Sequence, residues 1–582
     1  MSAGHDAHGH GPTSFWKKYV FSVDHKVIGL QYMFTAFCFL LIGFGLAILI
    51  RTQLAFPGRP IPFIGSLLPS SMAPGGIISP EFYNQLGAMH GTIMVFLGIV
   101  PLGVGAFGNY VLPLQIGAPD MAFPRWNMMS YWLYLPGGLI MLASFFLPGG
   151  AAQSGWTSYP PLSDISPGQT VWLCGMLLLI FSSLLGAVNF ITTTINMRAP
   201  GLSFSRMPVF VWAQFVTAIL LLLAFPPLQG AAIMQFMDRV FHTSFFLPAG
   251  LVISGEPLAR SGGGQVLLWQ HLFWFLAHPE VYVLLLPPMG IVAEIIANNT
   301  RKPLFGYKEM VGSMIFLGFM SFIVWAHHMF LSGMKPALAN FFLVTTMIIS
   351  IPSVAILTCL VASLKGGSIR FTNPMLFALA FLPLFGIGGL TGLPLGLTVT
   401  DIYLHDTYYV IGHFHYVVVT GSLLALMGGL YHWFPKMFGR RMSIGLGQVH
   451  FWGTAICMNG VFFPMLIQGL AGVQRRLYDP TAQTHNLSTQ YLNPVMTYFV
   501  YGLLLFQLPF IYNVIHSIFF GERVTDENPW RATTLEWATP TQPPHGNFAK
   551  TPTVWRGPYE YSVPGMDRDY LPQHEPEKGG RR

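Results

Sequence analysis

Twelve apolar stretches recur along the chain, each long enough to cross a lipid bilayer as one helix. A transmembrane helix needs about 20 consecutive, mostly apolar residues. Hydrophobic residues make up 53% of the sequence and charged residues 9%, against roughly 25% charged in a soluble domain. The sequence therefore predicts an all-α polytopic membrane protein with twelve transmembrane helices. These helices are expected at about 27–51, 84–113, 128–148, 170–196, 208–232, 266–296, 309–332, 338–364, 373–396, 408–433, 447–470 and 493–519.

The distribution of basic residues predicts the orientation of the helices. An even number of spans places both termini on one side, and loops on that side carry more Lys and Arg than loops on the other. Basic loops are cytoplasmic, so we expect cytoplasmic termini. The polar N-terminus lacks a short apolar region before a cleavage site and indicates a mature end rather than a signal peptide. The expected divisions are a cytoplasmic N-terminal segment (1–26), a twelve-helix domain (27–519) and a cytoplasmic C-terminal tail (520–582).

Charge and cysteine content exclude other classes of protein. The net charge of +7 follows from the basic loops, so it gives no argument for a nucleic-acid partner. The four cysteines lie within predicted spans and show no paired spacing. We interpret them as small buried hydrophobic residues rather than disulfides or thiolate ligands.

Seven histidines stand in apolar surroundings. Ionisable side chains are costly in lipid and mark functional sites there, and imidazole is a common ligand for copper and iron. These histidines therefore indicate metals inside a membrane protein. His405 lies at a loop edge in LHDTYYV. The other six lie in the motifs AMHG (His90), AHPEVY (His278), AHHMF (His327 and His328) and GHFHY (His413 and His415).

The GHFHY motif predicts two separate metal sites. On a helix, His413 and His415 point about 200° apart, so they cannot bind the same metal, but each can bind its own, with Phe414 between them. His90 lies at a similar depth in its predicted span. One histidine of the pair can therefore share a six-coordinate haem iron with His90, while the other holds a five-coordinate iron with an open face. The alternative is that either histidine only donates hydrogen bonds in a packed bundle.

The remaining three histidines predict a copper site. On a helix, the adjacent His327 and His328 splay by about 100° and need a third ligand, which His278 can supply. Three imidazoles with an open position suit copper. Tyr282 lies four residues after His278 and faces the same way, so its phenol can give one electron and one proton. Glu280 points elsewhere and is a lone mid-span carboxylate suited to proton relay, or else a carboxylate bonded to a neighbouring helix.

These motifs resemble a known family. WFLAHPEVY, VWAHHMF and HDTYYVIGHFHY, within a match from FSVDHKVIG to ENPWRATTLEW, are similar to subunit I of the haem-copper oxidases, cytochrome c oxidase type. The resemblance implies the catalytic subunit of a bacterial respiratory terminal oxidase. Such an enzyme reduces O2 to water at a high-spin haem/CuB centre, with electrons from cytochrome c or another donor complex, and couples this to proton translocation across the cytoplasmic (inner) membrane. Implied partners are subunit II, with a dinuclear copper domain, and subunit III.

The resemblance also implies a cofactor role for each motif residue. It implies two haems (haem A expected, B or O left open), CuB copper and magnesium, with Tyr282 covalently joined to His278. Without the resemblance, the arginines could merely mark the membrane interface. The implied ligands and contacts are His90 and His415 for the low-spin haem, His413 for the high-spin haem, His278, His327 and His328 for CuB, His405 and Asp406 for a magnesium shared with a second subunit, Arg475, Arg476 and Trp156 for haem propionates, and Arg51 for a low-spin haem substituent.

One of the two proton routes implied by the resemblance matches the family. It begins at Asp120, continues along hydroxyls and amides that can hold a file of water, and ends at Glu280. The polar residues along it are Asn109, Asn127, Asn189 and Ser183.

The second route departs from the family. The lysine expected four residues after Pro352 is Ile356, and the serine expected near the end of the sixth span is replaced by alanine, followed by Glu294. Either all protons use the first route, or Ser353, Thr358 and Glu294 form a substitute path. We hypothesise the substitute path, because Tyr282 still needs reprotonation.

Three other functions compete with this interpretation. A nitric oxide reductase of the same superfamily would use non-haem iron and lack the cross-linkable Tyr282. A quinol oxidase would carry an acidic residue four positions after Arg51, where this chain has Ala55. A polytopic transporter with structural histidines would show no visible absorption.

Overall fold

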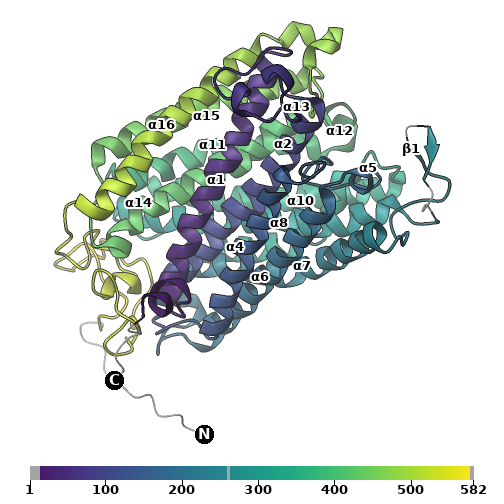
Figure 1. Cartoon of the computed structure of the whole chain (residues 1–582). Helices are drawn as coiled ribbons and strands as arrows, with labels where there is room; N and C mark the ends of the chain where they lie inside the picture. The colour runs from purple at the N-terminus through teal and green to yellow at the C-terminus, as the bar shows by residue number, and fades with distance from the viewer. Residues whose placement is uncertain (1–13, 254, 259–261, 577–582) are drawn as a thin grey trace.

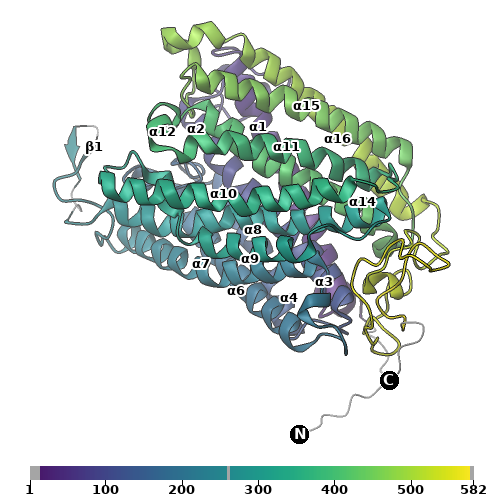
Figure 2. The same cartoon turned by 180° about the vertical axis from the view of Figure 1, so that it is seen from behind.

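The computed structural model describes residues 14–253, 255–258 and 262–576. Residues 1–13 of the expected N-terminal segment and 577–582 of the expected tail lie outside the described residues. Long helices pack side by side in one bundle, and both described ends of the chain lie at the same end of this bundle (Figure 1). We call this the terminal end. The small hairpin of β1 (Val252–Ile253) and β2 (Glu256–Pro257) projects at the opposite end (Figure 2).

Eleven spans among the described residues are long and apolar enough to cross a membrane. Nine are mainly single helices: α1 (His25–Ala55), α4 (Pro124–Ala143), α6 (Gln169–Asn196), α7 (Val209–Val240), α8 (Val266–Thr300), α10 (Pro336–Leu364), α11 (Asn373–Gly396), α15 (Ile444–Leu470) and α16 (Leu492–Phe520). Two are runs of shorter helices: α2 (Pro80–Thr92), η4 (Ile93–Ile99), η5 (Pro101–Gly108) and α3 (Asn109–Ile116), then α13 (Tyr408–His415), η9 (Tyr416–Leu423) and α14 (Leu424–Phe438).

Short elements connect these spans. They are η1 (Trp16–Val20), η2 (Gly65–Leu67), η3 (Pro74–Gly76), η6 (Ser144–Phe146), α5 (Leu162–Ile165), η7 (Phe204–Arg206), β1 (Val252–Ile253), β2 (Glu256–Pro257), α9 (Tyr307–Ser321), η8 (Trp325–Met329), α12 (Thr398–Leu404), η10 (Pro480–Ala482), η11 (Thr484–Thr489) and η12 (Leu535–Ala538). The two strands pair antiparallel, with Val252 opposite Pro257.

The predicted span 309–332 does not form one continuous helix. It contains α9, which ends at Ser321 after 15 residues, and then the 3-10 turn η8. A 15-residue helix is shorter than the roughly 20 residues that a full crossing needs. A 3-10 segment inside a helical region often marks a functional site, and η8 carries His327 and His328.

π-helical turns interrupt two spans close to histidines. η4 begins at Ile93, three residues after His90, and η9 begins at Tyr416, directly after His415. π-helical turns occur frequently at functional sites. They rotate the following residues relative to a regular helix, an effect that the apolar pattern of the sequence does not reveal.

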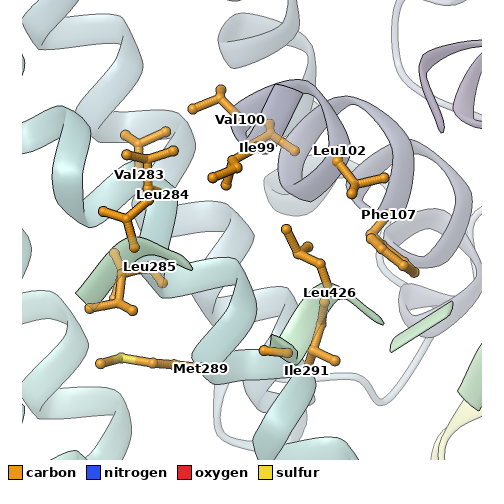
Figure 3. Close-up of a cluster of buried hydrophobic side chains, with 14 of the residues drawn as sticks. Ile99, Val100, Leu102, Phe107, Val283, Leu284, Leu285, Met289, Ile291 and Leu426 are labelled. Atoms are coloured by element: carbon orange, nitrogen blue, oxygen red, sulfur yellow. The ribbon is translucent and has the colours of Figure 1, made fainter. Parts of the chain in front are cut away.

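Helix α8 runs through the middle of the bundle (Figures 1 and 2). Every residue from Val283 to Thr300 is buried. Its apolar side chains pack against the π-helical part of the second span and against α14. Figure 3 labels part of this cluster: Ile99, Val100, Leu102 and Phe107 from the second span, Val283, Leu284, Leu285, Met289 and Ile291 from α8, and Leu426 from α14.

The C-terminal segment (521–576) folds against the terminal end of the bundle. The Arg301 guanidinium at the end of α8 donates two hydrogen bonds to the Asp569 carboxylate, at 2.7 and 2.9 Å. The Trp530 indole donates to the backbone oxygen of His432, and the Asn547 side chain bonds to His25. This segment therefore packs on several helices as part of the same structure.

Candidate functional site

Three histidine nitrogens converge at one point. His327 Nε2 lies 3.0 Å from His278 Nδ1 and 3.0 Å from His328 Nε2, and the third distance, between His278 Nδ1 and His328 Nε2, is 3.3 Å. An ion bound by imidazole lies about 2.0–2.1 Å from each nitrogen, so one ion above this triangle reaches all three. These histidines are also the only group of at least three His, Cys, Asp or Glu side chains that meets metal-site spacing among the described residues.

The expected splay does not separate the rings of His327 and His328. The two residues lie on the 3-10 turn η8, and their ring centroids are 4.3 Å apart, so side chains that leave the backbone in different directions still reach the same point. The third histidine of the group is His278 of α8, as the sequence indicated.

Two neighbours fix the orientation of this site. The hydroxyl of Thr346 in α10 lies 2.8 Å from His327 Nδ1, which leaves Nε2 to face the other two histidines. The Trp274 ring stacks on His328 at 3.8 Å with an interplanar angle of 10°. Groups that hold the second nitrogen of a ligand histidine set its tautomer and ring orientation. Neither contact was predicted from the sequence.

Tyr282 lies next to the same group. Its ring centroid is 5.0 Å from that of His278. His278 Nε2 is buried and has no hydrogen-bond partner among the described residues. The phenol and the free nitrogen of this imidazole are therefore neighbours on one face of α8.

The other three motif histidines each engage a backbone carbonyl through Nδ1. His90 contacts the oxygen of Gly43 at 2.9 Å, His413 that of Gly388 at 2.9 Å, and His415 that of Ile411 at 2.8 Å. This arrangement leaves Nε2 of each ring as the nitrogen available to a metal.

All six motif histidines line one cavity of about 1210 Å³. This volume exceeds the roughly 300–1,000 Å³ of a pocket for one drug-sized ligand. The cavity reaches Arg51, whose Nη2 donates to Asn493 Oδ1 at 2.8 Å. Arg51 Nε and Nη1 are buried without partners among the described residues. A polar substituent on a large bound group would satisfy them, so the residues fit haem.

The cavity ends at a polar rim. The Arg475 guanidinium donates to Asp406 Oδ1 at 2.5 Å, and His405 Nδ1 lies 3.5 Å from Asp401 Oδ2. Burial raises the pKa of Asp406, but the charges of Arg475 and His405 outweigh it and hold the pKa below its usual value. Two carboxylates and an imidazole therefore meet at this rim.

Arg476 lies beside Gly155, the residue that precedes Trp156. A Cβ added at Gly155 would lie 3.3 Å from the Arg476 guanidinium carbon, and one added at Gly91 would lie 2.9 Å from Trp156 Cβ. Trp156 therefore packs directly against the residue after His90. Both side chains, like Arg475, line the large cavity.

A second cavity, of about 50 Å³, lies beneath Glu280. A buried water needs about 10–15 Å³ on this measure, so the cavity has room for about three to five waters. Its wall includes the predicted Asn109 and Ser183. Glu280 Oε1 is buried without a hydrogen-bond partner among the described residues, which leaves it free to bond to water there.

Three further polar residues, which the sequence did not indicate, also line this cavity. The Tyr32 hydroxyl donates to Ser130 Oγ at 3.0 Å and lies 3.3 Å from Ser182 Oγ. Ser130 lies one helical turn after the predicted Asn127, and Ser182 lies two helical turns before the predicted Asn189. Each serine therefore shares a helix face with a predicted residue, and that face could have indicated it.

Asp120, Asn127 and Asn189 lie near one another below this cavity. Asn189 bonds to both backbone groups of Phe123, and Ser130 Oγ donates to the oxygen of Asn127 at 2.7 Å. Asp120 is half-buried, and burial raises its pKa despite the charge of His25. Asn189 therefore contacts the segment that follows Asp120, and Asn127 contacts Ser130 in the wall of the small cavity.

The predicted substitute path is not assembled. Ser353 lines the large cavity, whereas Thr358 is exposed on the outer face of α10 and Ile356 is buried. Glu294 bonds instead to the hydroxyl of Tyr559 at 2.6 Å. Ser353 and Thr358 do not share one face of α10, because five positions along an α-helix turn Thr358 well away from Ser353.

Comparison with known proteins is consistent with this site. The sequence matches the family described as cytochrome c and quinol oxidase polypeptide I over residues 27–505. Cytochrome c oxidase subunit 1 of Synechocystis sp. is 44% identical, covering 97% of this chain and 96% of the relative. Alternative cytochrome c oxidase subunit 1 of Bradyrhizobium diazoefficiens is 43% identical over 98% and 95%.

A solved structure shares the fold. A chain from the cryo-EM structure of a heme-copper terminal oxidase dimer aligns with a TM-score of 0.69 at 19% identity, covering 86% of this chain and 85% of that chain. The family match spans most of the sequence, and the relatives are similar over nearly their full length. This integral membrane protein therefore belongs to the family of cytochrome c and quinol oxidase polypeptide I.

Proposed function

We propose that this chain is the catalytic subunit of a respiratory terminal oxidase that reduces O2 to water with electrons from cytochrome c. The observation that carries the proposal is the convergence of His278, His327 and His328 on one point in a cavity that three further histidines also line. Relatives of this chain over nearly its full length are named cytochrome c oxidase subunit 1, which supports the same function.

The family implies haem and copper, and the six histidines divide between them. His278, His327 and His328 would hold the copper. His90 and His415 would hold a low-spin haem, and His413 a high-spin haem. When bound, these groups supply single-electron transfer and the site at which O2 is reduced.

Other side chains would position the haems. Arg51 offers two unpartnered donors to a haem substituent. Arg475, Arg476 and Trp156 lie where the propionates of haem would need cations and a rigid wall. We expect haem A, and haems B and O remain the alternatives.

Tyr282 and Glu280 would supply protons. Tyr282 lies beside His278 and can donate a proton and an electron from its hydroxyl, as a phenol covalently joined to His278. Glu280 can pass protons from the small cavity towards the large one, because it lines both. Waters held by Tyr32, Ser182 and Asn109 would carry protons up to Glu280.

Asp120 would collect protons at the terminal end, which we assign to the cytoplasm of a bacterial cell within its inner membrane. Asn127, Asn189 and Ser183 would hold waters between Asp120 and Glu280. Some of these protons would be consumed in forming water, and others would be pumped.

At the opposite rim, His405 and Asp406 would bind magnesium together with a second subunit. Asp406 is already paired with Arg475, and this chain would supply only two ligands. The second subunit would therefore have to supply others to complete the site. We expect this partner to be subunit II, with a dinuclear copper domain, and subunit III to complete the assembly.

Quinol is the competing electron donor. The residue four positions after Arg51 is Ala55 rather than an acidic residue, which favours cytochrome c. Nitric oxide reduction is less favoured because Tyr282 lies beside the three-histidine group.

Oxygen consumption by the purified oxidase complex tests the function. We expect consumption with reduced cytochrome c and little with a soluble quinol. His327→Asn should abolish it while leaving the haem absorption bands, since Asn leaves the triangle of nitrogens incomplete. Consumption supported only by quinol, or nitric oxide reduction by a complex without copper, would contradict the proposal.

A further inference from the structure

Two carboxyl groups lie buried together at the terminal end of the bundle. Glu294 of α8 and Glu536 of η12 are 5% and 1% exposed. Glu294 Oε1 accepts from the Tyr559 hydroxyl at 2.6 Å and from the backbone N–H of Phe210 at 3.3 Å. Glu536 Oε1 accepts from the Gln115 amide at 3.1 Å. We refer to Glu294 and Glu536 as the carboxyl pair.

The surroundings of the carboxyl pair favour retention of a proton. Lys436 is a cation of the same region, but its Nζ donates to the backbone oxygens of Glu527 and Thr539. Burial raises the pKa of Glu536, despite the hydrogen bond from Gln115. Glu536 Oε2 is buried and has no hydrogen-bond partner among the described residues. Burial makes the ionised form of each carboxyl costly.

A direct path from the pair along α8 towards Glu280 is closed. The intervening part of α8 presents apolar side chains that pack against Ile99, Val100 and Leu102 (Figure 3). A file of water cannot form through such close-packed apolar atoms.

Helix α7 offers a polar alternative, beginning where Phe210 donates to Glu294. Gln214 and Thr217 follow on successive turns of the same face, and Leu221 follows them in the wall of the small cavity beneath Glu280. Gln214 and Thr217 are fully buried. Gln214 Oε1 and Thr217 Oγ1 have no hydrogen-bond partner among the described residues.

Gln214 also contacts the second span one residue away from the wall of the small cavity. Its amide donates to the oxygen of Gly103 at 2.8 Å, and its Oε1 would lie 3.1 Å from a Cβ added at Gly108. The next residue, Asn109, lines the cavity and has an unpartnered Oδ1. Each unsatisfied buried polar atom costs about 1–3 kcal/mol, and buried water is the usual means of satisfying such atoms.

We propose that the carboxyl pair is a second proton-uptake site, connected to the cavity beneath Glu280 by waters bound to Gln214 and Thr217. This inference rests on the proposed function, because it requires Glu280 to use protons. A protonated carboxyl of the pair gives its proton to the water file, the file gives one to the Glu280 carboxylate, and cytoplasmic water reprotonates the pair. No electron moves in these steps.

The carboxyl pair would thus serve Glu280 rather than Tyr282. It would provide a proton supply in a chain whose Ile356 replaces the lysine of the second family route. Tyr559 and Glu536 both come from the C-terminal segment, so folding of that segment against the bundle builds the site.

A purely structural role is the alternative, because Glu294 and Tyr559 cap the first turn of α7. The Tyr559 hydroxyl accepts from the N–H of Val209 at 2.7 Å. Glu294→Gln keeps an acceptor oxygen for Phe210 but carries no exchangeable acid proton. Gln214→Leu keeps a side chain of similar volume and removes the polar amide. It leaves the contacts of Glu294 and Tyr559 with the first turn of α7 unchanged.

The test measures proton uptake with a pH-sensitive dye during turnover of the detergent-solubilised oxidase complex. Asp120→Asn removes the first route and should leave a measurable residual uptake. Adding Glu294→Gln or Gln214→Leu should lower this residual uptake by about 100-fold, the low end of what a positioned acid contributes. Adding Glu309→Gln, an exposed acid of α9, should leave it unchanged.

Infrared difference spectra give a second readout. A carboxyl band should appear on reduction and be absent from both Glu294→Gln and Glu536→Gln. The inference is overturned if residual uptake survives Glu294→Gln and Gln214→Leu, if Asp120→Asn alone abolishes uptake, or if neither substitution removes a carboxyl band. Failure of the unaltered complex to consume O2 would overturn the proposed function as well.

Discussion

His278 Nδ1 and His327 Nε2 lie 3.0 Å apart although they belong to different helical segments separated by 49 positions. Lone pairs of neutral imidazoles repel at this distance unless a cation or a proton lies between them. The 3-10 turn η8 brings His327 to α8, and Thr346 holds its other nitrogen. The site is therefore shaped by the interruption of a helix rather than by its regularity.

The contact from Thr346 should matter for copper binding. Thr346→Val removes the hydroxyl that orients His327, and loss of such a supporting contact typically costs 10–100-fold in metal affinity. We expect a copper affinity lower by about that factor, measured by chelator competition. Thr345→Val, at the neighbouring position of α10, should leave the affinity unchanged, and equal effects of the two substitutions would contradict the assignment.

Two glycines of α11 provide a matched test of the His413 site. A Cβ added at Gly392 would lie 2.7 Å from His413 Cε1, whereas one added at Gly389 would meet nothing within 4 Å. Gly392→Ala should displace the His413 ring and perturb the high-spin haem spectrum. Gly389→Ala should leave the spectrum unchanged, and the idea fails if Gly392→Ala does so too.

Removal of the acid at Glu280 should slow turnover. Glu280 lines both cavities and its Oε1 is unpartnered, so Glu280→Gln keeps the shape of the site but cannot donate an acid proton. We expect oxygen consumption to fall by about 100-fold, as for other positioned acids, with the haem spectrum retained. Glu81→Gln, an exposed acid, is the control; a similar loss there would remove the argument for Glu280.

An ion pair outside the membrane spans should make stability depend on pH. Burial raises the pKa of Asp24, but the charges of His25 and Lys26 and hydrogen bonds from His545 and Lys26 outweigh it and lower the pKa from 3.8 to about 2. The stabilisation is therefore fully present above pH 3.8 and is lost as the pH falls through about 2. It amounts to about 2 kcal/mol.

Thermal unfolding of the solubilised protein across this pH window checks the Asp24 prediction. Asp24→Asn should lower the unfolding temperature at neutral pH and flatten its decline in acid. The exposed Asp526→Asn should change neither, and a pH profile of Asp24→Asn parallel to that of the unaltered protein would refute the role of Asp24.

Hydrophobic patterning was sufficient to predict most of the fold. Spans such as α1 and α15 lie close to their expected positions, because a run of apolar residues of bilayer length has few alternatives to a helix. The division of 309–332 into α9 and η8 could not be predicted, since its apolar pattern is continuous. The folded C-terminal segment also escaped prediction, because its Pro-rich composition resembles that of a flexible tail.

The candidate site was predicted in its members but not in its geometry. The grouping of His278 with His327 and His328 follows from residue type and span order. The convergence of the last two depends on where η8 lies against α8, and the contact of Gln214 with Gly103 depends on which face of α7 meets the second span. Such relationships arise from packing between distant segments, which a single sequence does not encode locally.

The most direct measurement is a reduced-minus-oxidised visible spectrum of the purified complex, combined with its content of haem iron and copper. Binding at His90, His413, His415 and the three-histidine group predicts two kinds of haem band, low-spin and high-spin, with copper that is lost in His327→Asn. A spectrum without haem bands, or copper content unaffected by His327→Asn, would contradict this assignment of the histidines.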